Sequence, residues 1–463
     1  TTVSDALVFS FILQNPASAQ TSPAISIEAA IAGDGVNRAP IAAVAMTKPA
    51  GDLMSVAGGR VPLYVVVPSF DTKVIAHTSP LANIANTLSI EIKADVDMAP
   101  GTAVTLSGLT ASQTASAATG FSIAGTNASN LYDGITLEKA SWTKASGSLV
   151  VLLANGSLAA DSLVFAFELQ NPATAQASPS IYAQAAIAGD GVNRAPIAAV
   201  AMTKASGDLL GVSGGAVPLY VVVPAFVTKG ISHSSPLANV ENTISVTLQA
   251  SADMTPGSTI TLSGLTGAQD ADALSGFALK GANATILWDG ATLASASWIQ
   301  ASGALAVSVE NATNAEDALS FSFVLRNPTT VQASPYISVS GAILSVGAAG
   351  LTSPFTSVAM AKAAGALLGV ADAAAPLLTL IPTVALAAMG QSSPFAGGVN
   401  TLTLTLQFAQ DMAVGSTVTL AGLTGTNTPD TDALAVSDTR AAFNTSGVFN
   451  QSTGTLVLAL ADA

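Results

Sequence analysis

Two histidines are the only side chains whose ordinary pKa lies near neutral pH, and they occupy one repeated position. His77 and His233 each begin a His-x-Ser-Pro motif, and Gln391 takes that place in a third copy. A lone histidine in such a loop is more typical of a structural role than of general acid–base catalysis. We therefore expect both histidines to be structural.

One serine motif raises acyl-transfer chemistry. Residues 211–215 match G-x-S-x-G, which would make Ser213 the nucleophile of a strand–turn–helix elbow. The other copies place Ala57 and Ala371 there, and the neighbouring sequence lacks the helix pattern that the elbow needs. The chain also has no cysteine and no lysine-bearing phosphate loop, so we predict that it is not an enzyme and has no catalytic residues.

Calcium is the one metal that the acidic loops suggest. Each GDGVNR segment offers one Asp and one Asn, and the Asp-x-Asp pairs at 270–272 and 430–432 have no counterpart in the first copy. Calcium takes six to eight oxygen ligands, so two per loop are too few. We predict no metal site and no cofactor, with calcium as the disfavoured alternative. The residues concerned are Asp34, Asn37, Asp190, Asn193, Asp270, Asp272, Asp430 and Asp432.

Asn-x-Ser/Thr sequons follow the same repetition. Two pairs of them recur at equivalent positions, and Asn155 lies in a turn between two apolar runs, where a glycan can stand in solvent. The alternative is that Asn, Gly and Ser simply favour turns. We predict N-glycosylation, given a eukaryotic source, at Asn127, Asn155, Asn283, Asn311, Asn444 and Asn450.

Internal repetition dominates the organisation of the chain. Residues 32–48 recur unchanged at 188–204, which gives a period of 156 residues, and the Ser-Pro…Asn-Thr motif occurs three times. A period of this length fits a whole domain rather than a solenoid turn. The expected division is residues 1–34 (strands completing a neighbour's sandwich), 35–190 (first repeat), 191–347 (second repeat) and 348–463 (an incomplete third repeat).

Each copy is expected to be built of strands. In residues 7–13 apolar side chains alternate with variable ones, the pattern of a strand with one buried face. Seven or eight such strands per copy, with no long helical pattern, predict an all-β fold of three tandem immunoglobulin-like β-sandwiches, although the Cys…Trp…Cys signature is absent. Trp142, Trp298 and Phe449 are expected in the cores.

Composition excludes some classes of function. Charged residues make up 9% of the chain, its net charge is −14 and only 14 residues are Lys or Arg, so nucleic-acid binding is disfavoured. No apolar run reaches the 18 residues of a membrane span, and the sequence given shows no signal peptide. A surface so poor in charge is expected to be covered by other subunits or solubilised by glycans.

The two ends of the given sequence are expected to be two parts of one repeat. Residues 454–463 resemble the first half of the unit at 147–172, and residues 1–16 resemble its second half. The third sandwich would then need residues 1–32 of some chain. These could come from the same chain folding round, from a neighbouring chain, or from the next repeat of a longer array.

The side chains expected to make this contact are apolar. Burial of the first four would contribute about 6–12 kcal/mol gross, at about 1.5–3 kcal/mol each. The predicted assembly strand consists of Leu7, Phe9, Phe11, Leu13, Ile25 and Ile27, and the predicted acceptor strand of Leu456, Leu458 and Leu460, with strand 5–14 beside strand 454–462.

The repeated motifs also resemble a known family. Ser-Pro…Asn-Thr-[LI]-[ST]-[VIL], [VI]-Thr-Leu-[SA]-Gly-Leu-Thr and Phe-x-[LV]-x-Asn-Pro…Ser-Pro are similar to motifs of very large secreted tandem-repeat proteins of algae and related protists. The resemblance covers nearly the whole chain. It implies strings of β-sandwiches associated with extracellular fibrils and no catalytic residues. Members of that family often carry cysteines in this repeat, and this chain has none.

These observations favour a structural subunit of an extracellular glycoprotein fibril, polymerising head to tail by strand complementation between subunits. The expected partners are further copies of the chain and glycans. The alternative is a cell-surface adhesin or carbohydrate-binding sandwich array, which would need exposed aromatic side chains near polar groups. Aromatic residues make up 5% of the chain and fall mostly on apolar strand faces, which disfavours that alternative.

Overall fold

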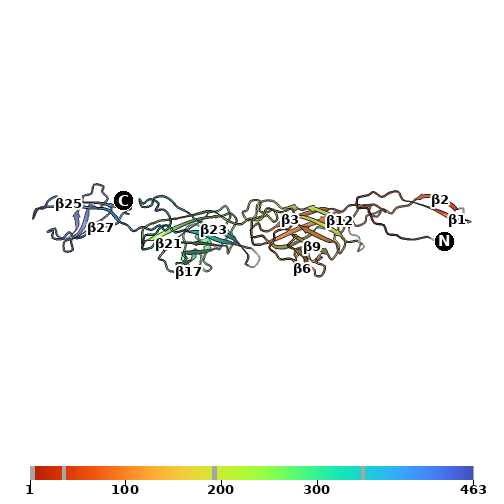
Figure 1. Ribbon diagram of the computed structural model, residues 1–463, viewed down its shortest axis with the longest axis horizontal. Helices are drawn as coiled ribbons and strands as arrows, with labels where there is room; N and C mark the ends of the chain where they lie inside the picture. Colours follow the sequence, from red (N-terminus) through yellow and green to blue (C-terminus); the bar gives the residue numbers. More distant parts are fainter. Residues whose placement is uncertain (1–5, 34–37, 190–194, 346–349, 462–463) are drawn as a thin grey trace. The chain divides into compact units, whose positions relative to one another are not determined.

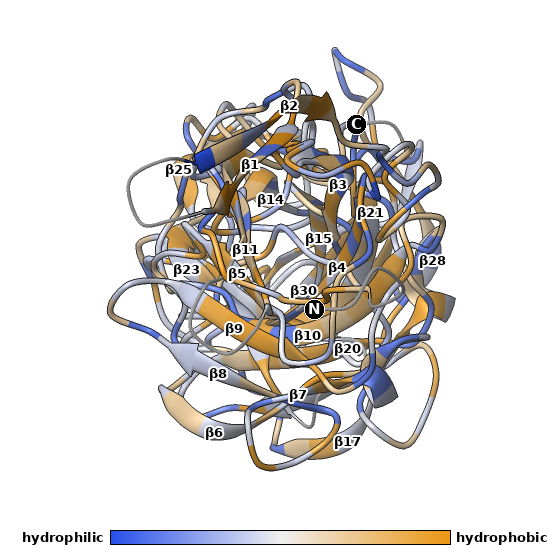
Figure 2. Ribbon diagram, turned by 90° about the vertical axis from the view of Figure 1, so that its right-hand side faces the viewer, coloured by the Kyte–Doolittle hydropathy of each residue, from blue (hydrophilic) through white to orange (hydrophobic). Residues whose placement is uncertain are grey.

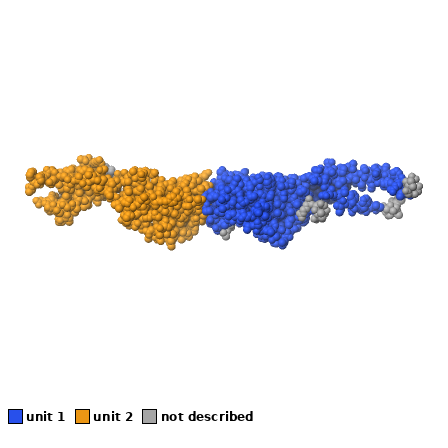
Figure 3. All heavy atoms as spheres, in the orientation of Figure 1, with its two compact units in different colours: residues 1–224, 344–354 blue, residues 225–343, 355–463 orange. Residues whose placement is uncertain are grey.

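The computed structural model describes residues 6–33, 38–189, 195–345 and 350–461. The chain divides into two compact units, residues 1–224 with 344–354 and residues 225–343 with 355–463 (Figure 3). The elements of the described residues are β-strands and two short 3-10 helices, labelled in part in Figure 1. The prediction of an all-β fold is confirmed.

Two sheets pack face to face in the first unit. The smaller sheet has the order β10-β4-β3-β13, and the larger has the order β12-β11-β5-β9-β8-β6, with β7 paired to β9. One buried apolar cluster takes Ile90 and Phe165 from the smaller sheet and Val104 and Trp142 from the larger. This is a β-sandwich. Its strands are β3 (Phe70–His77), β4 (Ala85–Ala94), β5 (Ala103–Ser107), β6 (Ala117–Ser122), β7 (Leu131–Tyr132), β8 (Lys139–Thr143), β9 (Ser148–Leu153), β10 (Leu163–Gln170), β11 (Tyr182–Ile187), β12 (Ala195–Ala201) and β13 (Thr203–Lys204).

The strands form because apolar and polar residues alternate along them, so that each strand turns one apolar face inward. Figure 2 shows this mixture of orange and pale or blue segments along the strands. β10 is the clearest case, since every second residue of its eight is buried. Trp142 and Trp298 are fully buried and Phe449 is 4% exposed, which confirms the prediction that these rings lie in cores.

The second unit repeats this pair of sheets. Its smaller sheet has the order β21-β15-β14-β24, and its larger sheet has the order β17-β19-β20-β16-β22-β23, with β18 paired to β20. The strands are β14 (Phe226–His233), β15 (Glu241–Ala250), β16 (Thr259–Ser263), β17 (Ala273–Ala278), β18 (Leu287–Trp288), β19 (Ser295–Ile299), β20 (Ala304–Val309), β21 (Leu319–Arg326), β22 (Ser338–Leu344), β23 (Thr352–Ala359) and β24 (Ala361–Lys362).

The last part of the second unit holds two smaller sheets. One is the pair β25-β26, and the other has the order β27-β30-β29-β28. By their sequence motifs these strands correspond to β3–β6, β8 and β9 of the first sandwich. The strands are β25 (Val384–Gln391), β26 (Leu402–Phe408), β27 (Thr417–Leu420), β28 (Thr431–Ala435), β29 (Ser446–Asn450) and β30 (Thr455–Ala459).

The start of the first unit holds an isolated hairpin. β1 (Ser26–Ala32) and β2 (Arg38–Ala45) pair only with each other in the described sheets. They correspond in sequence to β11 and β12, and residues 7–14 correspond to β10, but residues 6–16 are assigned no strand. Residues 7–45 thus correspond to the part of a sandwich that follows β9, but in the described sheets they pair with no other strand of a sandwich.

The sandwiches do not follow the expected repeat boundaries. The first runs from Phe70 to Lys204 and the second from Phe226 to Lys362, whereas the sequence suggested boundaries after residues 34, 190 and 347. The reason is that the segment after each AGDGVNR-like motif returns to the same sheet: β12 pairs antiparallel with β11 rather than starting a new domain. The boundary lies instead in the loops at 49–69 and 205–225.

Candidate assembly surface

The segment of residues 7–13 turns an apolar face to solvent. Its four alternating side chains are 62–72% exposed, whereas the corresponding side chains of β10 and β21 are at most 6% exposed. The exposed set is Leu7, Phe9, Phe11 and Leu13; the buried sets are Leu163, Phe165, Phe167, Leu169 and Leu319, Phe321, Phe323, Leu325. Because the side chains are the same types, the difference comes from what lies beside them.

Two aromatic rings of the segment already have the geometry of their counterparts in β10. The rings of Phe9 and Phe11 stack with centroids 6.4 Å apart and an interplanar angle of 26°. The corresponding rings of Phe165 and Phe167 stack at 6.4 Å and 28°. At Phe9 and Phe11 the segment therefore already presents its rings as β10 does, which lowers the cost of ordering these side chains on binding.

Within the first sandwich, β10 lies against β4. Leu163, Phe165 and Phe167 stand opposite Ile92, Ile90 and Leu88 in an antiparallel ladder, and the second sandwich repeats this register between β21 and β15. The complementary strand for residues 7–13 is thus the counterpart of β4 and β15.

That counterpart is β26, and it is open. Aligning the turn at Asn86 with that at Asn400 places Leu402 where Leu88 stands. Leu402 is 41% exposed and Leu88 is fully buried. Among the described residues, β26 pairs only with β25, so its other edge is free to accept a strand.

A second open edge lies on β27. In the first sandwich β5 pairs with both β9 and β11, but β27 pairs with β30 alone in the described sheets. The counterpart of β11 is β1, whose Ile27 and Ile31 are 53% and 60% exposed. Ile25, also predicted in the assembly strand, is half-buried.

The predicted acceptor strand, which lies in β30, is wrong. β30 is paired on both edges, with β27 and β29, so it cannot take another strand. Leu456 and Leu458 in β30, and Leu460 directly after it, are only 6–8% exposed. In the repeat, residues 454–463 correspond to β9 and residues 1–16 to the segment of β10, which follows it directly in sequence. In the first sandwich, however, β9 and β10 lie in different sheets and do not pair. Strands that are adjacent in sequence are therefore not partners here, and the predicted acceptor was wrong.

The histidines have a structural position, as expected. His77 is 8% exposed, and its Nε2 lies 2.7 Å from the backbone oxygen of Gly215. Its Nδ1 lies 3.0 Å from Nδ2 of Asn86 and accepts the Leu219 N–H at 3.3 Å. The ring is therefore neutral, with its proton on Nε2. Its hydrogen bonds to Gly215 and Leu219 hold the loop after β13 against the end of β3.

His233 makes equivalent hydrogen bonds in the second unit. Its Nε2 lies 2.7 Å from the backbone oxygen of Ala373, and its Nδ1 accepts the Leu377 N–H at 3.2 Å. Burial lowers the pKa of both histidines, and the hydrogen bond to the backbone oxygen offsets this only in part.

These pKa shifts predict lower stability in acid. The unfolded histidines keep a pKa near 6.5, so below about pH 6.5 the unfolded chain binds more protons than the folded one and the free energy of unfolding falls. Above that pH the contribution is fully present. We expect the thermal midpoint to drop more between about pH 7.5 and about pH 5.5 in the unsubstituted chain than in a His77→Gln/His233→Gln variant. Equal drops would contradict the role of these rings.

The sequons fall into two environments. Asn155, Asn311 and Asn444 are exposed. The other three are half-buried, and the side-chain oxygen of each accepts backbone hydrogen bonds: Asn127 from Val164 at 2.7 Å, Asn283 from Ser320 at 2.8 Å and Asn450 from Thr453 at 2.9 Å.

The residues considered for catalysis and metal binding form no such site in the described parts of the chain. Ser213 is exposed in a turn-rich loop, away from any strand-to-helix elbow. No group of three His, Asp or Glu side chains among the described residues is placed to hold a metal ion. Asp34, Asn37, Asp190 and Asn193 lie outside the described residues.

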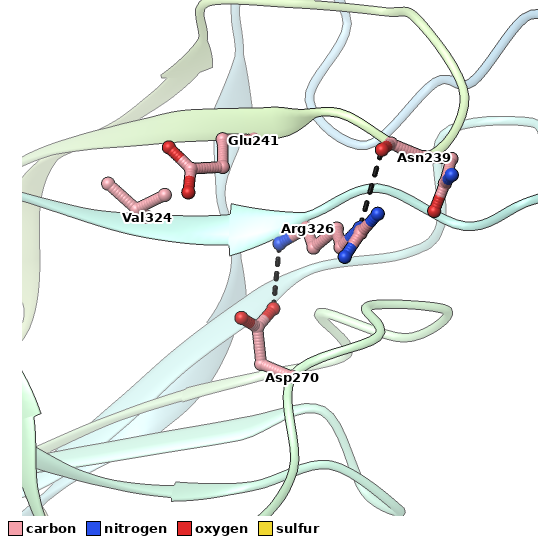
Figure 4. Close-up of a pocket in the computed structure, with 5 residues that line it drawn as sticks. All are labelled: Asn239, Glu241, Asp270, Val324 and Arg326. Carbon is pink, nitrogen blue, oxygen red and sulfur yellow. Dashed lines mark hydrogen bonds between the residues drawn. The ribbon is translucent and has the colours of Figure 1, made fainter.

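Three of the four aspartates in the acidic pairs instead accept hydrogen bonds from backbone groups. Asp272 accepts the Gln300 N–H at 2.7 Å, and Asp430 accepts the Gln451 N–H at 2.6 Å. Asp270 borders a shallow pocket with Asn239, Glu241, Val324 and Arg326 (Figure 4). There it accepts the backbone N–H of Arg326 at 2.7 Å, while the Arg326 Nε donates to the backbone oxygen of Asn239 at 3.3 Å. No aromatic ring lines this pocket, so it lacks the platform that the adhesin alternative requires.

Comparison with known proteins identifies no family. No family model matches the chain, and no curated protein matches it. Among solved structures, a marsupial T cell receptor matches 85% of this chain and 94% of its own at 8% identity and a TM-score of 0.19. A putative membrane anchored protein from Corynebacterium diphtheriae matches 74% and 97% at 10% identity and a TM-score of 0.16. These values are too low to indicate a relationship or a function.

Among the described residues, no helix has the length and apolar character needed to cross a bilayer.

Proposed function

We propose that this chain is a structural subunit of an extracellular glycoprotein fibril, and that its copies join head to tail by exchanging strands. One observation carries the proposal: the apolar face of residues 7–13 is 62–72% exposed, while its counterparts in β10 and β21 are at most 6% exposed. The same chain shows how such a segment is buried, in β10 against β4, and also contains an exposed counterpart of β4, which is β26. A second copy of this chain is therefore the partner whose chemistry fits.

The internal sandwiches supply the register of the exchange. Residues 7–13 of one copy pair antiparallel with β26 of the next, with Phe9 opposite Leu404 and Phe11 opposite Leu402, as Phe165 and Phe167 pair in the first sandwich. β1 adds to the free edge of β27, with Ile27 opposite Leu420, as β11 adds to β5. Each contact joins different surfaces of two identical chains, so repetition without closure builds a filament.

The energetics favour this exchange. Burying Leu7, Phe9, Phe11 and Leu13 contributes about 6–12 kcal/mol gross, which is comparable with the whole stability of a domain. The proposed subunit has no catalytic role and no metal or other cofactor. Glycans at the sequons would keep in solution a chain in which only 9% of the residues are charged.

Deletion of residues 1–16 tests the proposal. We expect electron microscopy and sedimentation to show filaments for the whole chain and only monomers or amorphous aggregates for the deleted one. The burial of Trp142 and Trp298, read by near-ultraviolet circular dichroism, verifies that both sandwiches remain folded. Long filaments from the deleted chain would refute strand exchange.

A further inference from the structure

A buried asparagine network follows each strand that corresponds to residues 7–14. Asn171, one residue beyond β10, is 1% exposed and donates from Nδ2 to the backbone oxygens of Ser79 and Leu81 at 3.0 and 2.8 Å. Its Oδ1 accepts from Nδ2 of Asn86 at 2.9 Å. The end of β10 thus holds the Ser-Pro turn that follows β3.

The second sandwich repeats the network with the same geometry. Asn327 is fully buried and donates to the oxygens of Ser235 and Leu237 at 2.9 and 2.8 Å, and it accepts from Asn242 at 2.8 Å. Three hydrogen bonds at fully or nearly fully buried asparagines, made twice, form a specific contact rather than a chance one.

The held turn is itself a docking element. Leu81 at its tip is 1% exposed and pairs with Val222, whose N–H donates to the Pro80 oxygen at 2.8 Å while its oxygen accepts from the Ala82 N–H at 2.9 Å. Leu237 pairs with Leu380 in the same way in the second unit.

A third copy of the turn, at residues 391–400, is already folded, but its tip is exposed to solvent. The Oδ1 of Asn400 accepts the N–H groups of Ser392 and Ser393 at 3.1 Å each, as Asn86 does for Thr78 and Ser79. Phe395 stands at the tip in place of Leu81, and it is 79% exposed.

The matching parts occur at the start of the chain. Asn15 corresponds to Asn171 and is exposed. The loop at 51–66 repeats the hydrogen bonds of the loop at 207–222: Asp52 accepts the Gly58 N–H at 3.0 Å, as Asp208 accepts the Gly214 N–H at 2.8 Å. Val66 in this loop corresponds to Val222.

We infer that the turn at 391–400 is a second docking element, held by two segments of a second copy of this chain. Asn15 of that copy bonds the backbone oxygens of Ser393 and Phe395 and the amide of Asn400. Val66 of that copy pairs with the turn, and Phe395 is covered as Leu81 is. The inference rests on the proposed strand exchange and adds to it a polar latch that sets the register, because a strand shifted by two residues would leave the Asn15 amide without its partners.

The test compares the concentration above which filaments form, measured by sedimentation, for three variants. Asn15→Ala and Phe395→Ser should each raise it roughly tenfold to a hundredfold, since they remove buried hydrogen bonds and one buried aromatic ring. Val414→Ser is the control, because Val414 is also exposed but its counterpart Pro100 stays exposed in the complete sandwich. Its threshold should not change.

The outcomes separate this inference from the proposed function. All three side chains are partly or largely in solvent, so folding of the monomer should be unaffected. An unchanged threshold for Asn15→Ala overturns the latch, even where Phe395→Ser weakens assembly through lost apolar contact. If the unsubstituted chain forms no filaments, the proposed strand exchange is wrong, and the latch that rests on it is wrong as well.

Discussion

A chain carrying Phe9→Ser and Phe11→Ser should no longer assemble at concentrations where the unsubstituted chain does. Each ring is more than 70% exposed in the described chain and has a counterpart that is 1–3% exposed in β10. Losing the burial of two phenylalanines weakens association by about 3–6 kcal/mol, or roughly 10²–10⁴-fold. Analytical ultracentrifugation over a range of concentrations measures the change.

The opposite face of the same strand provides the matched control. Ile12 is 91% exposed, and the corresponding residue of β10 is Glu168, which stays exposed in the complete sandwich. Ile12→Glu should therefore assemble as the unsubstituted chain does. If it abolishes assembly as fully as the double substitution, general stickiness of the segment explains the association and strand exchange does not.

The same side chain has a different effect where it is already enclosed. Phe165→Ala should reduce the free energy of unfolding of the first sandwich by about 3–5 kcal/mol, because it leaves a cavity between sheets at a position that is 1% exposed. Phe9→Ala should leave the stability of a dilute monomer unchanged, since its ring is 71% exposed.

Denaturant titration followed by tryptophan fluorescence compares the two variants. Trp142 reports on the first sandwich, whereas Trp288 and Trp298 both lie in the second. A Trp288→Tyr/Trp298→Phe background therefore leaves Trp142 as the one fluorescent tryptophan. Equal destabilisation by the two substitutions would mean that residues 7–13 are enclosed by their own chain in solution.

Strand composition and the choice of buried faces could be predicted from the sequence. The alternation at 163–169 identifies the buried face of β10, and the recurring tryptophans are indeed core residues. Both are local properties, since side chains of a strand alternate whatever the topology.

Strand partners and domain boundaries could not be predicted in the same way. β10 pairs with β4, more than seventy residues earlier, and no local pattern encodes that choice. The AGDGVNR motif has the composition of a linker, so the sequence predicts domain boundaries there. It lies instead between two strands of the same sheet, β11 and β12, and the predicted boundaries are wrong. The Ser-Pro motif was visible three times, yet its role as a docking turn depends on the buried Asn171, a contact between residues ninety positions apart.

A disulfide across the proposed junction tests the central claim most directly. The chain has no cysteine, so Ser10→Cys and Thr403→Cys create the only pair. Their counterparts Ala166 and Ser89 stand opposite each other. The N–H and oxygen of Ala166 both bond Ala124 on the other edge, at 2.7 and 2.8 Å, so the pair with Ser89 is the close, non-hydrogen-bonded kind that suits a disulfide.

Oxidation of this variant should produce a ladder of covalent dimers, trimers and longer chains on non-reducing gels, and reductant should return it to monomer. A Ser10→Cys/Gln407→Cys variant, four residues out of register on the same face of β26, should cross-link far less. Monomers closed by an internal disulfide, or filaments without cross-links, would contradict strand exchange between copies.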